Sequence, residues 1–138
     1  MDRVILTEKT ESLRRCLKRI EAKTPDDVAI LTADPDLQDI LVLNLSRAVQ
    51  LCVDIGSHII SESDVVAPAT MVEVFVSLNV LGVISDGTCE SMKRAVGFRN
   101  VAVYNYEVIN WDIVFAICTL SVTDFSQFVR EIERIRPE

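Results

Sequence analysis

Apolar residues recur every three or four positions through most of this sequence, and this spacing constrains the fold more than any other feature. In the segment 13–20, for example, the apolar positions are Leu13, Cys16, Leu17 and Ile20. Such spacing places side chains along one face of an α-helix, whereas a half-buried strand needs alternation at every second residue. No convincing alternation of that kind is present. The sequence therefore predicts an all-α fold.

Prolines and capping residues mark the first helix boundaries. We expect a first helix to end near Thr24 and Pro25, because proline disfavours helical geometry in the residue before it. Thr24 then begins a short helix that runs to Leu31, with proline in its first turn. Asp34 precedes a second proline and repeats this signal. It predicts a long central helix that keeps its apolar register over 37–59.

Similar signals divide the second half of the chain. Thr70 and Glu73 form a capping box, in which each side chain satisfies a free amide at the start of a helix. We expect that helix to end at Gly82. Asp86 is the expected cap of the next helix, which we predict to stop at Gly97.

The last helix is predicted to begin at Asn110 or Asp112. We expect its apolar side chains to point one way, and they are Ile113, Ile117, Leu120, Phe125, Phe128, Ile132 and Ile135. Helices joined by short loops pack as an antiparallel up-and-down helical bundle. With only 4 Gly and 4 Pro and no linker-like stretch, residues 1–138 are expected to form a single domain.

Composition limits where the chain resides and what it binds. Apolar residues make up 49% of the sequence, but charges interrupt them, and no run reaches the roughly 18 residues of a membrane span. The first residues include the acidic Asp2 and Glu8 and lack a basic region followed by an apolar core, so we expect no secretory signal and a cytoplasmic protein.

The four cysteines do not resemble a metal site. Cys16, Cys52, Cys89 and Cys118 lie far apart and include no Cys-x-x-Cys pair. Each has aliphatic neighbours at helical spacing, which predicts buried structural thiols. We therefore expect neither a metal nor a cofactor.

The net charge of −7 excludes a general nucleic-acid coat, which needs a broad basic surface. A local basic site is still compatible with this charge. The first helix carries a cluster of cations at Arg14, Arg15, Lys18, Arg19 and Lys23. Its simplest interpretation is a solvated helix face.

The segment 97–106 contains a motif of polar and charged residues that can take part in catalysis. It reads Gly-Phe-Arg-Asn-Val-Ala-Val-Tyr-Asn-Tyr. This resembles the signature of HEPN-superfamily ribonucleases of the HepT type: an Arg, a polar residue, three more positions and a His, then one further residue and a Tyr. Arg99, Asn100 and Tyr106 match the signature. Tyr104 stands where the family has its catalytic His.

Two other segments extend the resemblance over nearly the whole chain. The segment 51–60 resembles the long helix of HepT proteins, with Asp54 and His58 at matching positions, and 81–85 resembles the turn that leads to the motif. The resemblance implies a HEPN four-helix core with an extra short helix. Asp54 lies one turn before His58, where it can orient the imidazole, so both residues are supporting candidates.

The resemblance also implies a function. The resemblance implies the toxin of a toxin–antitoxin pair, a metal-independent endoribonuclease that acts on RNA, with tRNA as a candidate substrate. In HepT proteins the site is composite across a symmetric homodimer. A nucleotidyltransferase antitoxin of the MntA type neutralises them by AMPylating the last Tyr of the motif, which is Tyr106 here.

The expected chemistry assigns a role to each motif residue. RNA cleavage without metal removes a proton from a ribose 2′-hydroxyl and gives another to the leaving oxygen. Arg99 can grip the phosphate with two parallel hydrogen bonds, and we expect Lys93 and Arg94 to add attraction. Histidine suits both proton transfers, whereas tyrosine, with an ordinary pKa of about 10, can donate a proton but is a poor base at neutral pH. Asn100 and Tyr104 complete the predicted catalytic set.

Two alternatives come from other functional classes. In the first, Tyr104 abolishes cleavage, and the chain is an inactive HEPN domain that binds a nucleotidyltransferase. In the second, the chain is an unrelated helical bundle that binds a small ligand or a partner helix. The position of Arg99 and Tyr106 relative to a shared cleft separates the second alternative from the others.

Overall fold

The computed structural model describes residues 3–135, apart from the side chain of Ser121. Met1 and Asp2, which contribute to the expectation of no secretory signal, lie outside these residues. The elements in chain order are α1 (Arg3–Lys23), α2 (Val28–Thr32), α3 (Pro35–Ser61), α4 (Met71–Val80), α5 (Asp86–Tyr104), the 3-10 helix η1 (Tyr106–Val108) and α6 (Trp111–Arg134).

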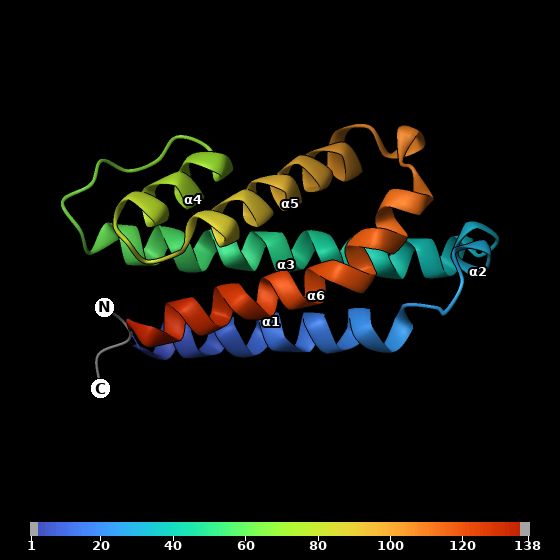
Figure 1. Ribbon diagram of the computed structural model, residues 1–138, viewed down its shortest axis with the longest axis horizontal. Coiled ribbons are helices and arrows are strands. Elements are labelled where there is room, and N and C mark those ends of the chain that lie inside the picture. Colours follow the sequence, from blue (N-terminus) through green and yellow to red (C-terminus); the bar gives the residue numbers. More distant parts are fainter. Residues whose placement is uncertain (1–2, 136–138) are drawn as a thin grey trace.

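The long helices lie side by side as an antiparallel bundle, which confirms the predicted fold class (Figure 1). The longest helix, α3, contacts α1, α4, α5 and α6. The short helix α4 packs on α3 and α5, and α2 fills the gap between α3 and α6. The C-terminal end of α5 lies at the same end of the bundle as the start of α3 (Figure 1), because Tyr106, just after α5, contacts Asp39 of α3.

By length and composition alone, α3 could cross a membrane, because its most apolar stretch has a mean hydropathy of 1.3. In the bundle, however, 56% of that stretch is buried. Its apolar side chains, among them Leu41, Leu45, Ala48, Cys52 and Ile55, belong to the core cluster shared with the other helices. This helix is therefore the core helix of the bundle.

Most of the predicted caps are present. The Asp34 carboxylate accepts a hydrogen bond from the amide of Leu37 at 3.0 Å, and Asn110 caps α6. The short helix α2 begins later than predicted, because Asp27 and not Thr24 is its cap. The Thr24 hydroxyl instead donates to the carbonyl of Ile20 and closes the end of α1.

The boundaries of α4 also agree with the sequence. The amide of Glu73 donates to the Thr70 hydroxyl at 3.1 Å, which confirms the capping box. Gly82 follows the helix with a φ of 78°, a conformation that glycine adopts without a steric penalty. Ser85, one residue before the predicted Asp86, caps α5.

The predicted helix stop at Gly97 is wrong. Helix α5 continues through Gly97 to Tyr104, and among the described residues only Gly82 has a positive φ. A glycine inside a helix costs about 1 kcal/mol, and the residues after it offset this cost through packing. Ala102 is buried and Phe98 packs against the core. Residues 97–104 of the motif therefore lie on the last two turns of α5, and Tyr106 follows in the 3-10 helix η1.

The single apolar stripe predicted for α6 divides into two. Phe125, Phe128 and Ile132 are buried as expected, but Ile113 and Leu120 are 55% and 67% exposed. The reason is geometric, since five residues separate Leu120 from Phe125 and turn the helix by about 140°. The core side of the first half is occupied instead by Val114 and Cys118, and the exposed stripe faces α5.

A buried carboxylate joins α6 to the start of α5. Glu131 is 5% exposed and accepts hydrogen bonds from the Ser85 amide at 2.6 Å, the Thr88 hydroxyl at 2.5 Å and the Gln127 amide at 2.9 Å. Burial raises the pKa of Glu131, but these hydrogen bonds outweigh it and leave the pKa below its ordinary value. The ionised form is therefore the one that the fold stabilises.

We predict that Glu131→Gln lowers the free energy of unfolding by about 1–3 kcal/mol at neutral pH, because charge-assisted hydrogen bonds are lost. Since the folded pKa lies below the unfolded one, this stabilisation is present above the unfolded pKa and disappears as the pH falls through the folded pKa. Urea unfolding at several pH values should show the gap between native and variant closing in acid. Glu133→Gln, which removes an exposed ion pair with Arg14, should cost less than about 1 kcal/mol.

Candidate functional site

Arg99 is a half-buried cation without an acidic partner. Its guanidinium donates to the side-chain oxygen of Asn100 at 3.2 Å. Across residues 3–135, no carboxylate lies within 4.0 Å of it. A partly buried charge that is left uncompensated attracts an anion, and guanidinium is well shaped to hold a phosphate.

Tyr104 ends α5 and is 76% exposed. Five residues separate it from Arg99, which rotates the two side chains by about 140° around the helix axis. Asn100, one turn earlier, is on the same side as Tyr104. The structure thus brings Asn100 near each of the other two, but it does not direct Arg99 and Tyr104 to one face of a single chain.

Tyr106 is held by two residues that the sequence analysis did not identify. Its hydroxyl donates to the Asp39 carboxylate at 2.5 Å, and its ring meets the edge of Trp111 with centroids 6.1 Å apart. Burial and the hydrogen bond to Asp39 raise the pKa of Tyr106 to about 12. Asp39 lies 67 residues away in the chain, so no local motif pointed to it.

Asp54 and His58 lie toward the other end of α3. At 1.5 Å per residue they are about 22 and 28 Å along the helix from Asp39. The Asp54 carboxylate accepts hydrogen bonds from Lys9 at 3.3 Å and Gln50 at 2.9 Å. The structure therefore does not bring these two supporting candidates to the motif of the same chain.

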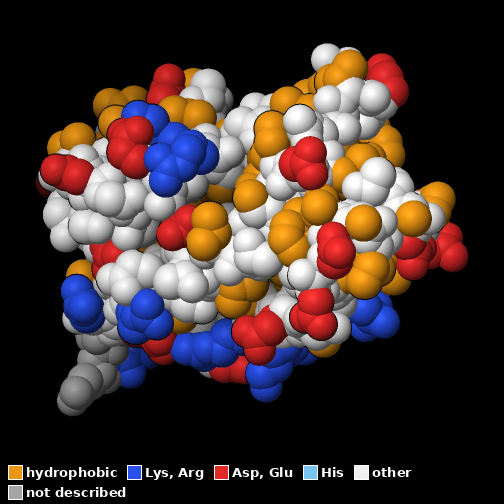
Figure 2. All heavy atoms as spheres, turned by 45° about the vertical axis from the view of Figure 1, so that its right-hand side comes forward, with side chains coloured by type: hydrophobic (Ala, Val, Ile, Leu, Met, Phe, Trp, Pro, Cys, Tyr) orange, Lys and Arg blue, Asp and Glu red, His pale blue; other side chains and the backbone are white. Residues whose placement is uncertain are grey.

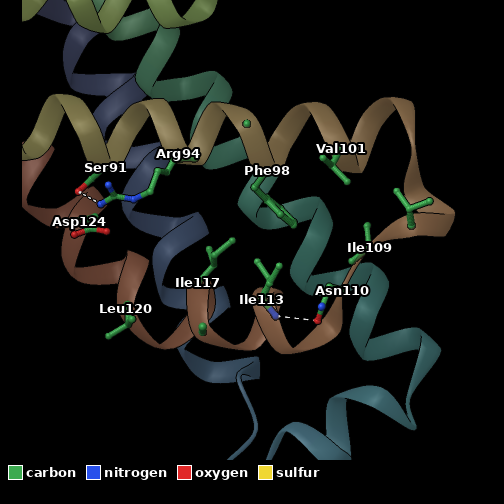
Figure 3. A pocket seen from close by; sticks show the side chains of 14 residues that line it. Ser91, Arg94, Phe98, Val101, Ile109, Asn110, Ile113, Ile117, Leu120 and Asp124 are labelled. Carbon is green, nitrogen blue, oxygen red and sulfur yellow. Dashed lines mark hydrogen bonds between the residues drawn. The ribbon is translucent and has the colours of Figure 1, made fainter.

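The two cations expected to assist Arg99 are otherwise engaged. Lys93 forms an ion pair with Glu90 at 3.0 Å. Arg94 donates to the hydroxyl of Ser91 and points into a groove beside α6 (Figure 3). Arg99 is thus the principal phosphate-binding candidate within the motif.

That groove runs between the C-terminal half of α5 and the N-terminal half of α6, with a volume of about 590 Å³. Phe98, Val101, Ile109, Ile113 and Ile117 form its apolar walls (Figure 3). Apolar side chains also gather around this end of the surface (Figure 2). The motif segment thus adjoins a large exposed apolar surface.

The cysteines are buried, as the sequence predicted, and none is in a disulfide. Burial raises the pKa of Cys118 to about 11 and that of Cys52 well above its ordinary value, so both thiols stay protonated. Within the described part of the chain, no three His, Cys, Asp or Glu side chains gather closely enough to hold a metal ion.

Comparisons with known proteins agree on one family. The family model described as "Ribonuclease HepT-like" matches residues 12–132. The chain is 33% identical to a Shewanella oneidensis protein named mRNA nuclease HepT, over 94% of this chain and 96% of that protein. These findings confirm the resemblance that the motif indicated.

Solved structures extend the likeness to three dimensions. The tri-AMPylated Shewanella oneidensis HEPN toxin, in complex with MNT antitoxin, superposes with a TM-score of 0.89 at 32% identity, covering 97% of this chain and 99% of that one. A toxin–antitoxin structure with AMP-PNP gives 0.88 at 32% identity, over 94% and 98% of the two chains. The Bacillus subtilis cytosolic protein YutE, at 14% identity, shares the fold with a TM-score of 0.82, over 96% and 89% of the two chains.

We predict that Asp39→Asn lowers the pKa of Tyr106 from about 12, because the carboxylate that favours the protonated phenol is gone. Burial remains, so the pKa should stay above the ordinary value of about 10. Ultraviolet titration in a Tyr104→Phe background reports Tyr106 alone, since the chain has 2 tyrosines. An unchanged midpoint would contradict the contribution of Asp39.

Proposed function

The chain belongs to the HepT-like ribonuclease family, and from this premise we propose that it is a toxin that cleaves RNA without a metal ion, at a site built around Arg99. We further propose that residues 1–138 act as one cytoplasmic HEPN domain. Its partner is a nucleotidyltransferase antitoxin, as in the complex of the Shewanella oneidensis relative. The observation that carries the proposal is the uncompensated, half-buried guanidinium of Arg99 within the family motif.

The chemistry follows from this cation. A ribose 2′-oxygen attacks the adjacent phosphorus, its proton leaves to a base, and the 5′-oxygen departs with a proton from an acid. Arg99 stabilises the extra negative charge on the phosphate oxygens as the phosphorane forms. The side-chain oxygen of Asn100 accepts a hydrogen bond from the guanidinium at 3.2 Å and so restricts its orientation. Tyr104, at the family's His position, is the acid that protonates the leaving oxygen.

A second copy of the chain completes this site. Arg99 and Tyr104 point about 140° apart on one helix, so one chain alone does not aim both at a single phosphate. A twofold axis near the end of α5 would set Arg99 of one chain opposite Tyr104 of the other. We therefore propose a homodimer in which the two motifs face each other.

The exposed apolar groove supports this arrangement. It borders the motif segment itself, through Gly97, Phe98 and Val101, and continues over Ile113 and Leu120. Exposed apolar patches of this kind typically mark interaction sites. A surface of this kind can pair with its own copy across a twofold axis, which is the geometry of an isologous dimer.

One observation favours the alternative of an inactive domain. The exposed phenol of Tyr104 replaces a group that can both accept and donate protons near neutral pH. In that case the chain keeps the fold, the dimer and the antitoxin, and Arg99 binds RNA without cutting it. Restoring the histidine distinguishes the two candidates.

We predict that Tyr104→His increases RNA cleavage over the native chain, because imidazole supplies the base that tyrosine lacks. The measurement is the digestion of total RNA by purified protein in the presence of a chelator. Native protein should cleave slowly. Arg99→Gln should reduce cleavage by about 100-fold or more in both backgrounds, since a charge-stabilising donor is lost.

The control is Arg130→Gln, which removes an exposed cation on α6 that bonds only to Gln127 in the described chain. It should leave cleavage unchanged. Cleavage by Tyr104→His but not by the native chain would support the inactive-domain alternative. Absence of cleavage by either would refute the ribonuclease proposal.

We also propose that Tyr106 is the residue that the antitoxin modifies. Its oxygen would attack the α-phosphorus of a nucleoside triphosphate, the bond to pyrophosphate would break, and the phenolic proton would pass to Asp39, 2.5 Å away. Because the pKa of Tyr106 is raised to about 12, the phenolate does not form unaided, and a base in contact with the hydroxyl matters. The added phosphate would then compete with RNA for Arg99.

We predict one or more AMP groups on Tyr106 after co-expression with the MNT antitoxin of the relative or a cognate nucleotidyltransferase. Mass spectrometry of proteolytic peptides locates them. Tyr106→Phe should abolish the modification, Asp39→Asn should slow it, and Tyr104→Phe should leave it intact. AMP on Tyr104 alone, or on neither tyrosine, would overturn this assignment.

A further inference from the structure

A second basic site lies on a different part of the molecule. Two arginines of the cationic cluster on α1, Arg15 and Arg19, meet Arg47 of α3 around a shallow hollow of about 420 Å³. The rest of its lining consists of Ser12, Cys16, Asn44, Gln50 and Leu51. Lys and Arg side chains are visible along the lower edge of the surface, interspersed with Asp and Glu (Figure 2).

The positive charge of this hollow is not neutralised by the chain. The neighbouring Arg14 is paired with Glu11 and Glu133. In contrast, no carboxylate of residues 3–135 lies within 4.0 Å of Arg15, Arg19 or Arg47. The bond recorded for Arg15 is to the hydroxyl of Ser12 at 2.9 Å.

The nearby acidic groups are also occupied. Glu11 accepts a hydrogen bond from Arg14, and Asp54 accepts hydrogen bonds from Lys9 and Gln50. Three exposed guanidinium groups therefore surround one hollow in a chain whose net charge is −7. Like charges repel at this range, so their grouping costs free energy unless an anion joins them.

The thiol of Cys16, which lines the hollow, lies close to two of these arginines. Burial raises the pKa of Cys16, and the charges of Arg47 and Arg15 act in the opposite direction. Both cations are therefore close enough to act on one atom, although 32 residues separate them in sequence. Arg15 and Arg19 lie one helical turn apart, about 6 Å along the axis.

We propose that Arg15, Arg19 and Arg47 bind the phosphodiester backbone of RNA at a site separate from the cleavage motif. Guanidinium groups hold phosphate oxygens in a two-pronged geometry, and three of them around one hollow can engage neighbouring phosphates of the same strand. Helix α1 does not contact α5, so this site holds a different part of the RNA from the phosphate at Arg99.

RNA fits this hollow better than an acidic protein segment does. RNA carries one phosphate per nucleotide, so a short stretch of its backbone can engage all three arginines of the hollow, whereas an acidic protein segment rarely presents three carboxylates so close together. A strongly acidic chain also needs a local cationic site to hold a long polyanion. The inference rests on the proposed RNA function, which it deepens.

The test measures binding separately from cleavage. A short fluorescent 2′-O-methyl RNA of mixed sequence has no free 2′-hydroxyl, so it binds but is not cut. We expect Arg15→Gln, Arg19→Gln and Arg47→Gln together to weaken its affinity by about tenfold or more. The slope of log affinity against log salt should fall by about 2, since each lost phosphate contact removes about 0.7.

The matched control replaces Arg3, Arg130 and Arg134 with Gln. Both triple variants change the net charge from −7 to −10, but the control residues lie outside the hollow and are exposed. Its affinity should stay within about threefold of the native chain. Replacing the three hollow arginines with Lys should give an intermediate affinity, because charge is kept and the fork geometry is lost.

The possible outcomes distinguish failure of the second site from failure of the proposed function. If the two Gln triples bind RNA alike while Arg99→Gln still loses cleavage, the second site is refuted and the proposed function stands. If the Arg15, Arg19 and Arg47 triple Gln variant binds RNA like the native chain but no longer binds the nucleotidyltransferase antitoxin, the hollow docks a protein and the proposal is wrong. A native chain that binds no RNA contradicts both proposals. Circular dichroism verifies folding, and Arg47→Gln alone replaces the triple variant if the triple unfolds.

Discussion

The burial of the apolar face of α3 against its neighbours is the interaction on which the other features depend. This helix contacts every other long helix and contributes side chains such as Leu41, Leu45 and Ile55 to the shared core. Because it spans about 40 Å, it fixes where both ends of α5 lie. Asp39, near its start, then binds Tyr106 and holds the segment after α5 against the bundle. The position of the motif is thus a consequence of core packing and not of local loop geometry.

Local signals in the sequence predicted the helices where capping chemistry alone decides the boundary. Asp34, Thr70 and Gly82 lie where hydrogen bonds or a positive φ end a helix, and the structure confirms each of them. Gly97 carries the same local signal, but packing of Phe98 and Ala102 keeps the helix intact through it. Periodicity likewise cannot separate two apolar stripes that serve the core and the surface, as in the first half of α6.

In the candidate site, too, some residues could be predicted from the sequence and others could not. Arg99, Asn100, Tyr104 and Tyr106 are adjacent in sequence, so their spacing alone could identify them. The contacts of Tyr106 with Asp39 and Trp111 depend on how distant segments pack, and no local pattern encodes them. The same holds for the meeting of Arg47 with the basic cluster of α1. Asp54 and His58 show the converse, since matching positions in a helix did not place them beside the motif.

The central claim is that two copies of the motif face each other around one phosphate. All four native cysteines are buried, so Asn100→Cys introduces a selectively reactive thiol on the exposed side of α5. Pulsed electron resonance between nitroxide labels at this position measures the distance between the two motifs. If the two motifs face each other, we expect one distance well below the roughly 40 Å length of α3. No dipolar coupling, or a distance as long as the bundle, would contradict it.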